Sequence, residues 1–146
     1  MGTWTTETQM AGRPDEVMVL LTQPDTIARW APIPFELVDF RHHRLLTGDT
    51  ARVRGGLAGR NVEFTVEIAQ ASDGRLALTA SGPIDIDVEY VAEEIPDGSN
   101  VRARVNVSGR GFVGRLLAQA TDGLLAAGAL RSAVSRIARE LEPATA

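Results

Sequence analysis

Two residue types are missing from this chain of 146 residues: it has no cysteine and no lysine. Without cysteine, the chain cannot form a disulfide, a thiolate metal site or a cysteine nucleophile. All 15 basic residues are therefore arginines; they are dispersed along the chain, and the net charge is −4. Phosphate binding needs clustered positive charge, so nucleic acid is not expected as a partner.

Long hydrophobic runs are also missing. No stretch approaches the roughly 18 apolar residues of a membrane-spanning helix, and the first residues lack the basic and apolar segments of a secretion signal. The expectation is a cytoplasmic protein without a membrane span. Its length, with 44% hydrophobic and 23% charged residues, is typical of one globular domain covering residues 1–146. The composition does not indicate an oligomeric state.

The second half of the chain carries the pattern of an antiparallel sheet. Apolar and polar residues alternate over 61–68, as in a half-buried strand. Turn signals recur at 55–56, 73–74, 81–83 and 96–99, which predicts a meander of hairpins. A last hairpin turning at Asp97 and Gly98 would place Tyr90 opposite Val105 and Glu93 opposite Arg102.

The first part of the chain predicts a strand, two short helices and two further strands. Residues 4–10 alternate as a strand; Pro14 then starts a helix that ends near Gln23, and a second helix runs from Pro24 to Ala31. Residues 35–40 and 49–54 are expected to be strands, and 112–141 is expected to be one long helix that covers the sheet.

The predicted long helix has a continuous apolar seam that is small in its first half and large in its second. The residues of this seam are Leu116, Ala120, Gly123, Ala127, Leu130, Val134, Ile137 and Leu141. The small half either leaves a pocket over the sheet near Trp30 or lets the helix pack closer to the sheet. The sequence leaves both interpretations open, and the pocket is preferred.

Two motifs are better explained by structure than by chemistry. Residues 109–114 match GxGxxG, but no parallel strand or acidic residue follows as a dinucleotide fold requires. Asp85 and Asp87 alternate along a predicted strand and should both face solvent, whereas metal ligands must converge. Neither a metal site nor a cofactor is indicated.

The order of these elements leads to a family resemblance. The segments that carry it are Arg13–Val17, Leu20–Asp25, Arg29–Pro32, Gly48–Val53 and Gly114–Leu117. The chain resembles the START-like, helix-grip superfamily, also called SRPBCC, in its polyketide cyclase and dehydrase branch. Met18 and Gln23 stand where the family often has Trp and Asp.

The resemblance implies an α+β helix-grip fold: a curved antiparallel sheet, two short helices after the first strand and one long C-terminal helix. For function it implies hydrophobic ligand or lipid binding, aromatase or cyclase chemistry, or a chaperone-like role. The shared motifs mark helix starts and turns, so activity has to be argued from the site itself.

A ligand cavity would be lined from the inward face of the sheet, the two short helices and the long helix. The predicted lining residues are Trp30, Val53, Phe64, Val66, Leu78, Ile86, Val88, Tyr90, Val105, Ala120, Leu124 and Ala127. The polar residues expected on the inward face are Thr6, Thr8, Glu36, His42, Asp49 and Tyr90. Tyr90 and His42 are the candidates for proton transfer, although a strand tyrosine usually packs in a core and a histidine in a polar turn is usually exposed.

Three functions compete on this evidence. The first is a carrier or sensor that binds a hydrophobic, possibly aromatic or polyketide-like small molecule. The second is a polyketide cyclase, aromatase or dehydratase in which the shape of the cavity folds the substrate. The third is a non-enzymatic module that binds a protein partner.

Overall fold

The computed structural model describes residues 2–31, 35–40, 44–57, 60–109 and 111–141. Its centre is a seven-stranded antiparallel sheet in the order β1-β7-β6-β5-β4-β3-β2. The strands are β1 (Gly2–Met10), β2 (Phe35–Asp39), β3 (Thr50–Leu57), β4 (Arg60–Ser72), β5 (Arg75–Ser81), β6 (Ile84–Ile95) and β7 (Gly98–Gly109). The helices are α1 (Pro14–Thr22), α2 (Pro24–Trp30), α3 (Gly111–Ala126) and α4 (Ala129–Glu140).

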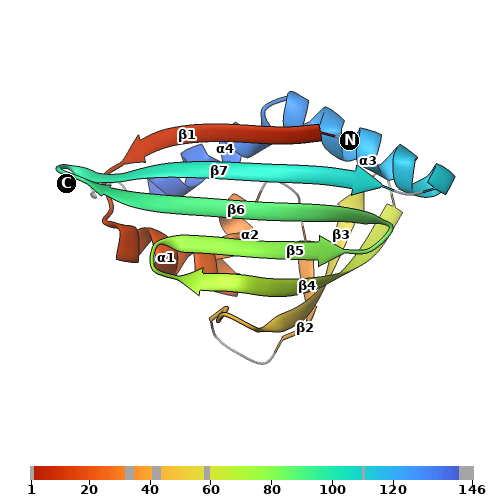
Figure 1. The fold of residues 1–146 in the computed structure, drawn as a ribbon, viewed down its shortest axis with the longest axis horizontal. Coiled ribbons are helices and arrows are strands. Elements are labelled where there is room, and N and C mark those ends of the chain that lie inside the picture. The colour runs from red at the N-terminus through yellow and green to blue at the C-terminus, as the bar shows by residue number, and fades with distance from the viewer. Residues whose placement is uncertain (1, 32–34, 41–43, 58–59, 110, 142–146) are drawn as a thin grey trace.

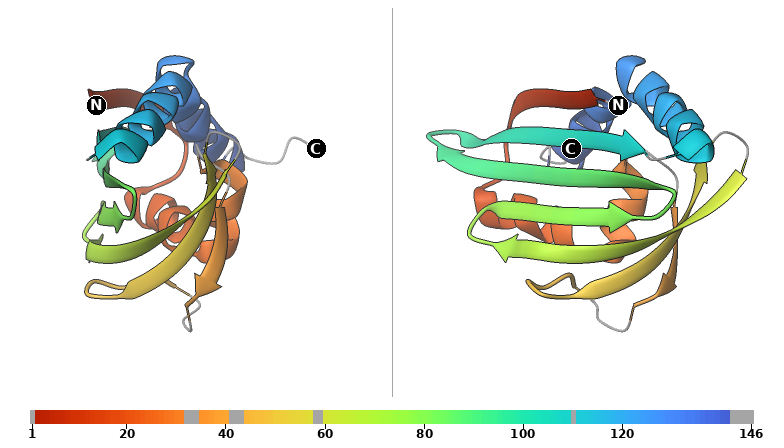
Figure 2. Two further views of the ribbon diagram at one scale, coloured as in Figure 1. Left: turned by 90° about the vertical axis from the view of Figure 1, so that its right-hand side faces the viewer. Right: turned by 45° about the vertical axis from the view of Figure 1, so that its right-hand side comes forward.

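All four helices lie on one side of the sheet, and the strands curve around them (Figures 1 and 2). The alternating apolar residues of the strands face these helices and form the core with them. This is the α+β helix-grip arrangement expected for the chain. No helix in the described ranges is long and apolar enough to cross a membrane.

The two short helices begin at prolines, as predicted. Pro14 and Pro24 each occupy the first turn, where a missing N–H costs no intrahelical hydrogen bond. The carbonyl oxygen of Leu20 in α1 accepts hydrogen bonds from Thr26 Oγ1 at 2.7 Å and from Trp30 Nε1 at 2.9 Å. These two bonds fix α2 against α1 and hold the Trp30 indole under the sheet.

The predicted single C-terminal helix is wrong in one respect: it is divided into α3 and α4. Gly128 has φ of +98°, in the left-handed region that glycine adopts without strain. The chain therefore changes direction at Gly128, and the two helices cross at an angle (Figure 2). Figure 1 shows α3 beyond one end of β7 and α4 behind β1.

The break at Gly128 also changes which face of α3 is buried. In α4 the predicted seam is correct, since Leu130, Val134 and Ile137 are buried. In α3 it is wrong, because Leu116 is 51% exposed and Gly123 and Ala127 are exposed as well. The buried residues of α3 include Leu117, Ala118, Thr121 and Leu125 instead.

The last hairpin has a different register from the predicted one. Tyr90 pairs with Ala103 and Glu93 with Asn100, and the hairpin closes at Ile95 and Gly98. The pairing is shifted by two residues, an even number, so each side chain keeps its predicted face. The charged pair survives diagonally, with Arg102 Nη2 2.6 Å from Glu93 Oε1.

The GxGxxG segment allows the backbone at the end of β7 to approach the start of α3. A Cβ atom at Gly109 would lie 2.2 Å from the carbonyl oxygen of Gly114, and one at Gly114 would lie 2.8 Å from that of Pro83. A side chain at either position would collide with backbone. The two glycines thus have a structural explanation in close backbone packing.

Candidate functional site

A cavity of about 200 Å³ lies between the concave face of the sheet and the helices. Five strands, β3 to β7, contribute inward-facing side chains to it, and β2, α2 and α3 close its sides. The lining residues are Pro24, Ile27, Trp30, Ala31, Phe35, Leu37, Leu45, Ala51, Val53, Gly55, Phe64, Val66, Leu76, Leu78, Ala80, Ile86, Val88, Tyr90, Val105, Thr121 and Leu125. None of these described lining residues carries a charged side chain, and only Trp30, Tyr90 and Thr121 have a polar side-chain atom.

Most of the predicted lining residues are found on the cavity wall. They are Trp30, Val53, Phe64, Val66, Leu78, Ile86, Val88, Tyr90 and Val105. Ala120, Leu124 and Ala127 are not among the lining residues, because the break at Gly128 turns that face of α3 away from the sheet. On α3, Thr121 and Leu125 line the cavity instead. Whether this cavity binds a ligand stays a prediction.

The sequence did not indicate the part of the wall formed by β2. Phe35 and Leu37 line the cavity, whereas Glu36 points outward, with its side chain 74% exposed and 3.9 Å from Arg54. The expectation that Glu36 faces inward is therefore wrong. The apolar side chains at 35 and 37 on a five-residue strand were a signal for this, but so short an alternation fits either face. Leu37 is 37% exposed, so the cavity reaches the surface at this edge of the sheet.

The other polar candidates do not converge on the cavity. Asp49 lies in a turn, where its Oδ2 accepts a hydrogen bond from the backbone N–H of Leu46 at 2.9 Å. Thr6 and Thr8 are half-buried on the inner face of β1, outside the cavity lining. His42 lies outside the described residues. Within the described ranges, no group of His, Cys, Asp or Glu side chains is placed to hold a metal ion.

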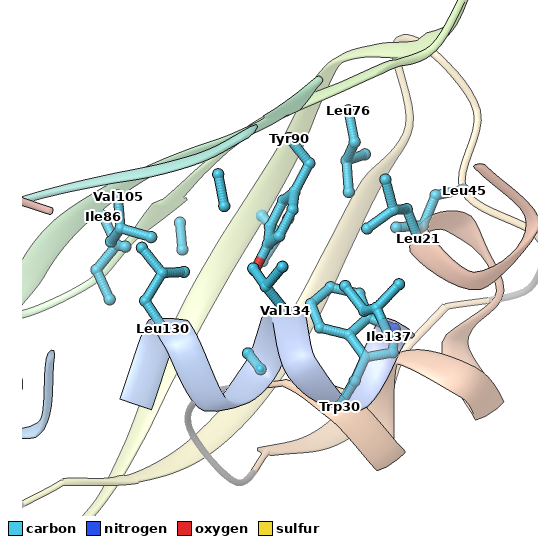
Figure 3. Close-up of a cluster of buried hydrophobic side chains, with 14 of the residues drawn as sticks. Leu21, Trp30, Leu45, Leu76, Ile86, Tyr90, Val105, Leu130, Val134 and Ile137 are labelled. Carbon is cyan, nitrogen blue, oxygen red and sulfur yellow. The ribbon is translucent and has the colours of Figure 1, made fainter. Parts of the chain in front are cut away.

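Tyr90 and Trp30 form an aromatic pair on the cavity wall. Their ring centroids are 5.3 Å apart and the rings meet edge to face at 71°. Tyr90 is only 1% exposed, and its ring extends from β6 toward α4 with the hydroxyl oxygen at the far end (Figure 3). The sheet and the indole together fix the position of this ring.

The hydroxyl of Tyr90, a residue of the cavity lining, has no hydrogen-bond partner among the described residues, and its oxygen is not fully buried. The other polar groups near the cavity are already engaged. Trp30 Nε1 donates to Leu20 O, and Thr121 Oγ1 donates to the carbonyl oxygen of Leu117 at 2.9 Å. Buried polar groups are nearly always hydrogen-bonded, so an unpartnered phenol in an apolar cavity is unusual.

Burial raises the pKa of the Tyr90 phenol far above its ordinary value of about 10, because the charged phenolate would lose its hydration there. The side chain is therefore neutral at physiological pH. A neutral phenol both donates and accepts a hydrogen bond. It can bind a polar group of a ligand, or assist a proton transfer, without placing a charge in the cavity.

This pKa shift predicts a loss of stability in alkali. The chain has one tyrosine, no lysine and no cysteine, so in the unfolded state Tyr90 is the one side chain with an ordinary pKa between about 9 and 12. Above pH ~10 the unfolded state loses the phenol proton and the folded state keeps it. The free energy of unfolding should then fall by about 1.4 kcal/mol for each pH unit. Urea unfolding at pH 9, 10 and 11 measures this.

The Tyr90→Phe variant is the matched control for the alkaline experiment. It lacks the titrating group and loses no protein hydrogen bond, so it should be as stable as the wild type at pH 8 and keep that stability at pH 11. An equal alkaline loss in both proteins would contradict a buried, neutral Tyr90.

Comparison with known proteins identifies the fold. No protein-family model and no curated protein matches the sequence. Among solved structures, the crystal structure of protein CV1439 from Chromobacterium violaceum is similar with a TM-score of 0.71 at 12% identity, over 99% of this chain and 100% of the other. The two chains share one fold. At this identity the likeness extends to the fold alone.

Two further structures agree with this result. Protein jhp0584 from Helicobacter pylori is similar with a TM-score of 0.68 at 13% identity, over 97% of this chain and 88% of the other. DynU16, a protein from the dynemicin biosynthetic locus, is similar with a TM-score of 0.58 at 21% identity. That match covers 95% of this chain and 46% of DynU16.

Proposed function

We propose that this protein binds a hydrophobic small molecule in the cavity between the sheet and the helices. The observation that carries the proposal is the cavity itself, about 200 Å³ in volume and lined almost wholly by apolar side chains. Ligand sites are typically apolar hollows with a few polar groups that fix orientation. This cavity has that composition, with Tyr90 as its polar group.

The energetic cost of leaving such a cavity empty supports the proposal. At ~24 cal/mol per Å³, a dry void of this size costs about 5 kcal/mol. Whole domains are stable by only ~5 to 15 kcal/mol, so the cost is large. Water would not fill the space favourably, because a buried water needs two to four polar partners and the lining supplies few. An apolar ligand would remove the cost.

The volume sets the size of the ligand. An engineered apolar cavity of ~150 Å³ holds one benzene molecule. By that comparison, about 200 Å³ suits a compound of one or two rings. A polyketide-like chain or a larger lipid would have to extend out of the cavity at the β2 edge, where Leu37 is exposed.

The fold and the cavity are what membership of the START-like, or SRPBCC, superfamily would give. We propose that residues 1–146 form one such domain. Its similarity to DynU16 and to CV1439 supports the fold on which this assignment rests.

Binding should appear as thermal stabilisation that depends on ligand size. We expect 2-methylnaphthalene, a two-ring hydrocarbon, to raise the melting temperature more than toluene or the four-ring pyrene. A ligand at 100 times its Kd adds ~2.7 kcal/mol to the free energy of unfolding. Differential scanning fluorimetry over a concentration series measures the shift. Failure of every apolar probe to move the melting temperature would contradict the proposal.

A second candidate is a cyclase or aromatase that acts on a polyketide-like substrate folded in the same cavity. It is favoured by the similarity to DynU16, which belongs to a biosynthetic locus, and by the neutral phenol of Tyr90, which could donate a proton to a carbonyl oxygen. Turnover of a synthetic linear triketone, followed by mass spectrometry, tests it. Cyclisation by the wild type that falls at least about tenfold in Tyr90→Phe would support it, and a rate equal to that in buffer would exclude it for this substrate.

A further inference from the structure

We infer that the Tyr90 hydroxyl is a hydrogen-bond anchor that selects an uncharged ring compound bearing one polar group, a phenol or a ketone. It would favour such a compound over a hydrocarbon of the same shape and over a carboxylic acid. This inference rests on the proposed ligand-binding function and specifies its ligand class. Three observations support it: the fixed placement of Tyr90, the hydrogen bonds already made by the polar groups near it, and the lack of charged side chains among the described lining residues.

Tyr90 is held in one position before any ligand arrives. Its backbone pairs with Leu76 on β5 and Ala103 on β7, so it lies in the interior of the sheet. Its ring meets Trp30 edge to face, and that indole is fixed by its own hydrogen bond to Leu20 O. A hydroxyl on so constrained a ring offers its hydrogen bond in a defined direction, and little side-chain entropy is lost on binding.

The hydroxyl is the one polar group in the described lining that still needs a partner. The Thr121 hydroxyl already donates to Leu117 O, and the Trp30 N–H donates to Leu20 O. The oxygen of Tyr90 lies at the end of the ring that points toward α4, near Val134 in the view of Figure 3. A ligand's polar group would lie against this oxygen, with its rings among apolar side chains such as Phe64 on β4.

The lining offers nothing to balance a charge. Among the described residues that line it there is no Arg, Asp, Glu or His. Arg136 on α4 lies beside Trp30 but is already engaged, since its Nη1 donates to the carbonyl oxygens of Trp30 and Ala31 at 3.4 and 3.2 Å. Arg75 is paired with Glu89 at 2.6 Å in the outward-facing hollow of the sheet. An ionised carboxylate would therefore be buried without a partner, which is strongly unfavourable.

The test compares three probes of one shape on two proteins. The probes are 2-naphthol, 2-methylnaphthalene and 2-naphthoate, and the proteins are the wild type and Tyr90→Phe. We expect the wild type to prefer 2-naphthol to 2-methylnaphthalene, and Tyr90→Phe to reduce that preference by about 2- to 12-fold, the range of one neutral hydrogen bond. We expect 2-naphthoate at pH 7 not to bind either protein. Fluorescence titration of each probe gives the Kd values.

The Thr6→Val variant is the control for losing a hydroxyl elsewhere on the inner face of the sheet. Thr6 lies on β1 outside the cavity lining, so this variant should keep the wild-type preference. An equal preference for 2-naphthol in wild type and Tyr90→Phe would overturn the inference while leaving the proposed function intact. Tight binding of 2-naphthoate would also overturn it. Binding of no probe to any variant would refute the proposed function itself.

Discussion

Replacing Ala80 by phenylalanine is expected to weaken binding of 2-methylnaphthalene at least about 100-fold, a change of about 2.7 kcal/mol. Ala80 is a buried residue of β5 that lines the cavity between Val66 on β4 and Ile86 on β6. A phenyl group there would project into the space that the ligand needs. The same variant should be more stable than the wild type without ligand. Filling half of the cavity, at ~24 cal/mol per Å³, contributes about 2 kcal/mol.

Ala80→Phe is expected to weaken ligand binding and to raise the stability of the ligand-free protein. Only a side chain that fills the cavity should have both effects. Thr65→Phe is the matched control, because Thr65 is exposed on the outer face of β4 and its phenyl group would not enter the cavity. It should bind the probe as the wild type does. Ala51→Phe, on β3, repeats the test from another strand in case Ala80→Phe folds poorly. Unchanged binding in both cavity variants, measured by fluorescence titration, would place the ligand site elsewhere.

The sheet side of the cavity could be predicted from the sequence because a strand has a period of two. Once Phe64 and Val66 are assigned to the inner face, the alternation fixes their neighbours. Even the wrong register of the last hairpin did not disturb this, since a shift of two residues returns Tyr90 and Val105 to the same face. The predicted lining positions on β3 to β7 were therefore unaffected by the error in the hairpin register.

The helix side could not be predicted as well, because the phase of a helix is lost at any break. The seam through Leu130, Val134 and Ile137 was extended backward across Gly128 as though the helix were continuous. A glycine inside a helix costs only about 1 kcal/mol, so the sequence does not reveal whether Gly128 interrupts it. With the left-handed φ at Gly128, the buried face of α3 differs from the extended seam and includes Thr121 and Leu125.

Whether the Tyr90 hydroxyl has a hydrogen-bond partner also could not be predicted from the sequence. The sequence indicated Tyr90 as an inward residue, but a strand tyrosine in a core normally finds a hydrogen-bond partner. Whether it does depends on which groups distant elements bring near the hydroxyl, and no described residue forms a hydrogen bond with it. Hydrogen-bond satisfaction is a property of the packed structure, and it distinguishes an anchor from an ordinary core residue.

Replacing Gly98 by alanine is expected to destabilise this fold strongly. Gly98 begins β7 with φ of +151°, and a Cβ atom there would lie 2.0 Å from the carbonyl oxygen of Met10 and 2.9 Å from the carbonyl carbon of Ala11. Both contacts are with backbone, which cannot rotate away. The hairpin would have to separate from the end of β1, at a cost of at least ~3 kcal/mol. The melting temperature should fall by about 10 °C.

The separation would also break contacts that connect the sheet to α1. Ser99, the next residue, pairs with Met10, and its hydroxyl donates to the carbonyl oxygen of Gly12 at 2.6 Å, two residues before α1 begins. Gly56→Ala is the matched control, since Gly56 is exposed on β3 with open space around its Cβ position and no positive φ. That variant should change the free energy of unfolding by less than about 1 kcal/mol in either direction. Urea unfolding of both variants decides the matter, and equal stabilities would show that the β6–β7 turn tolerates a side chain at Gly98.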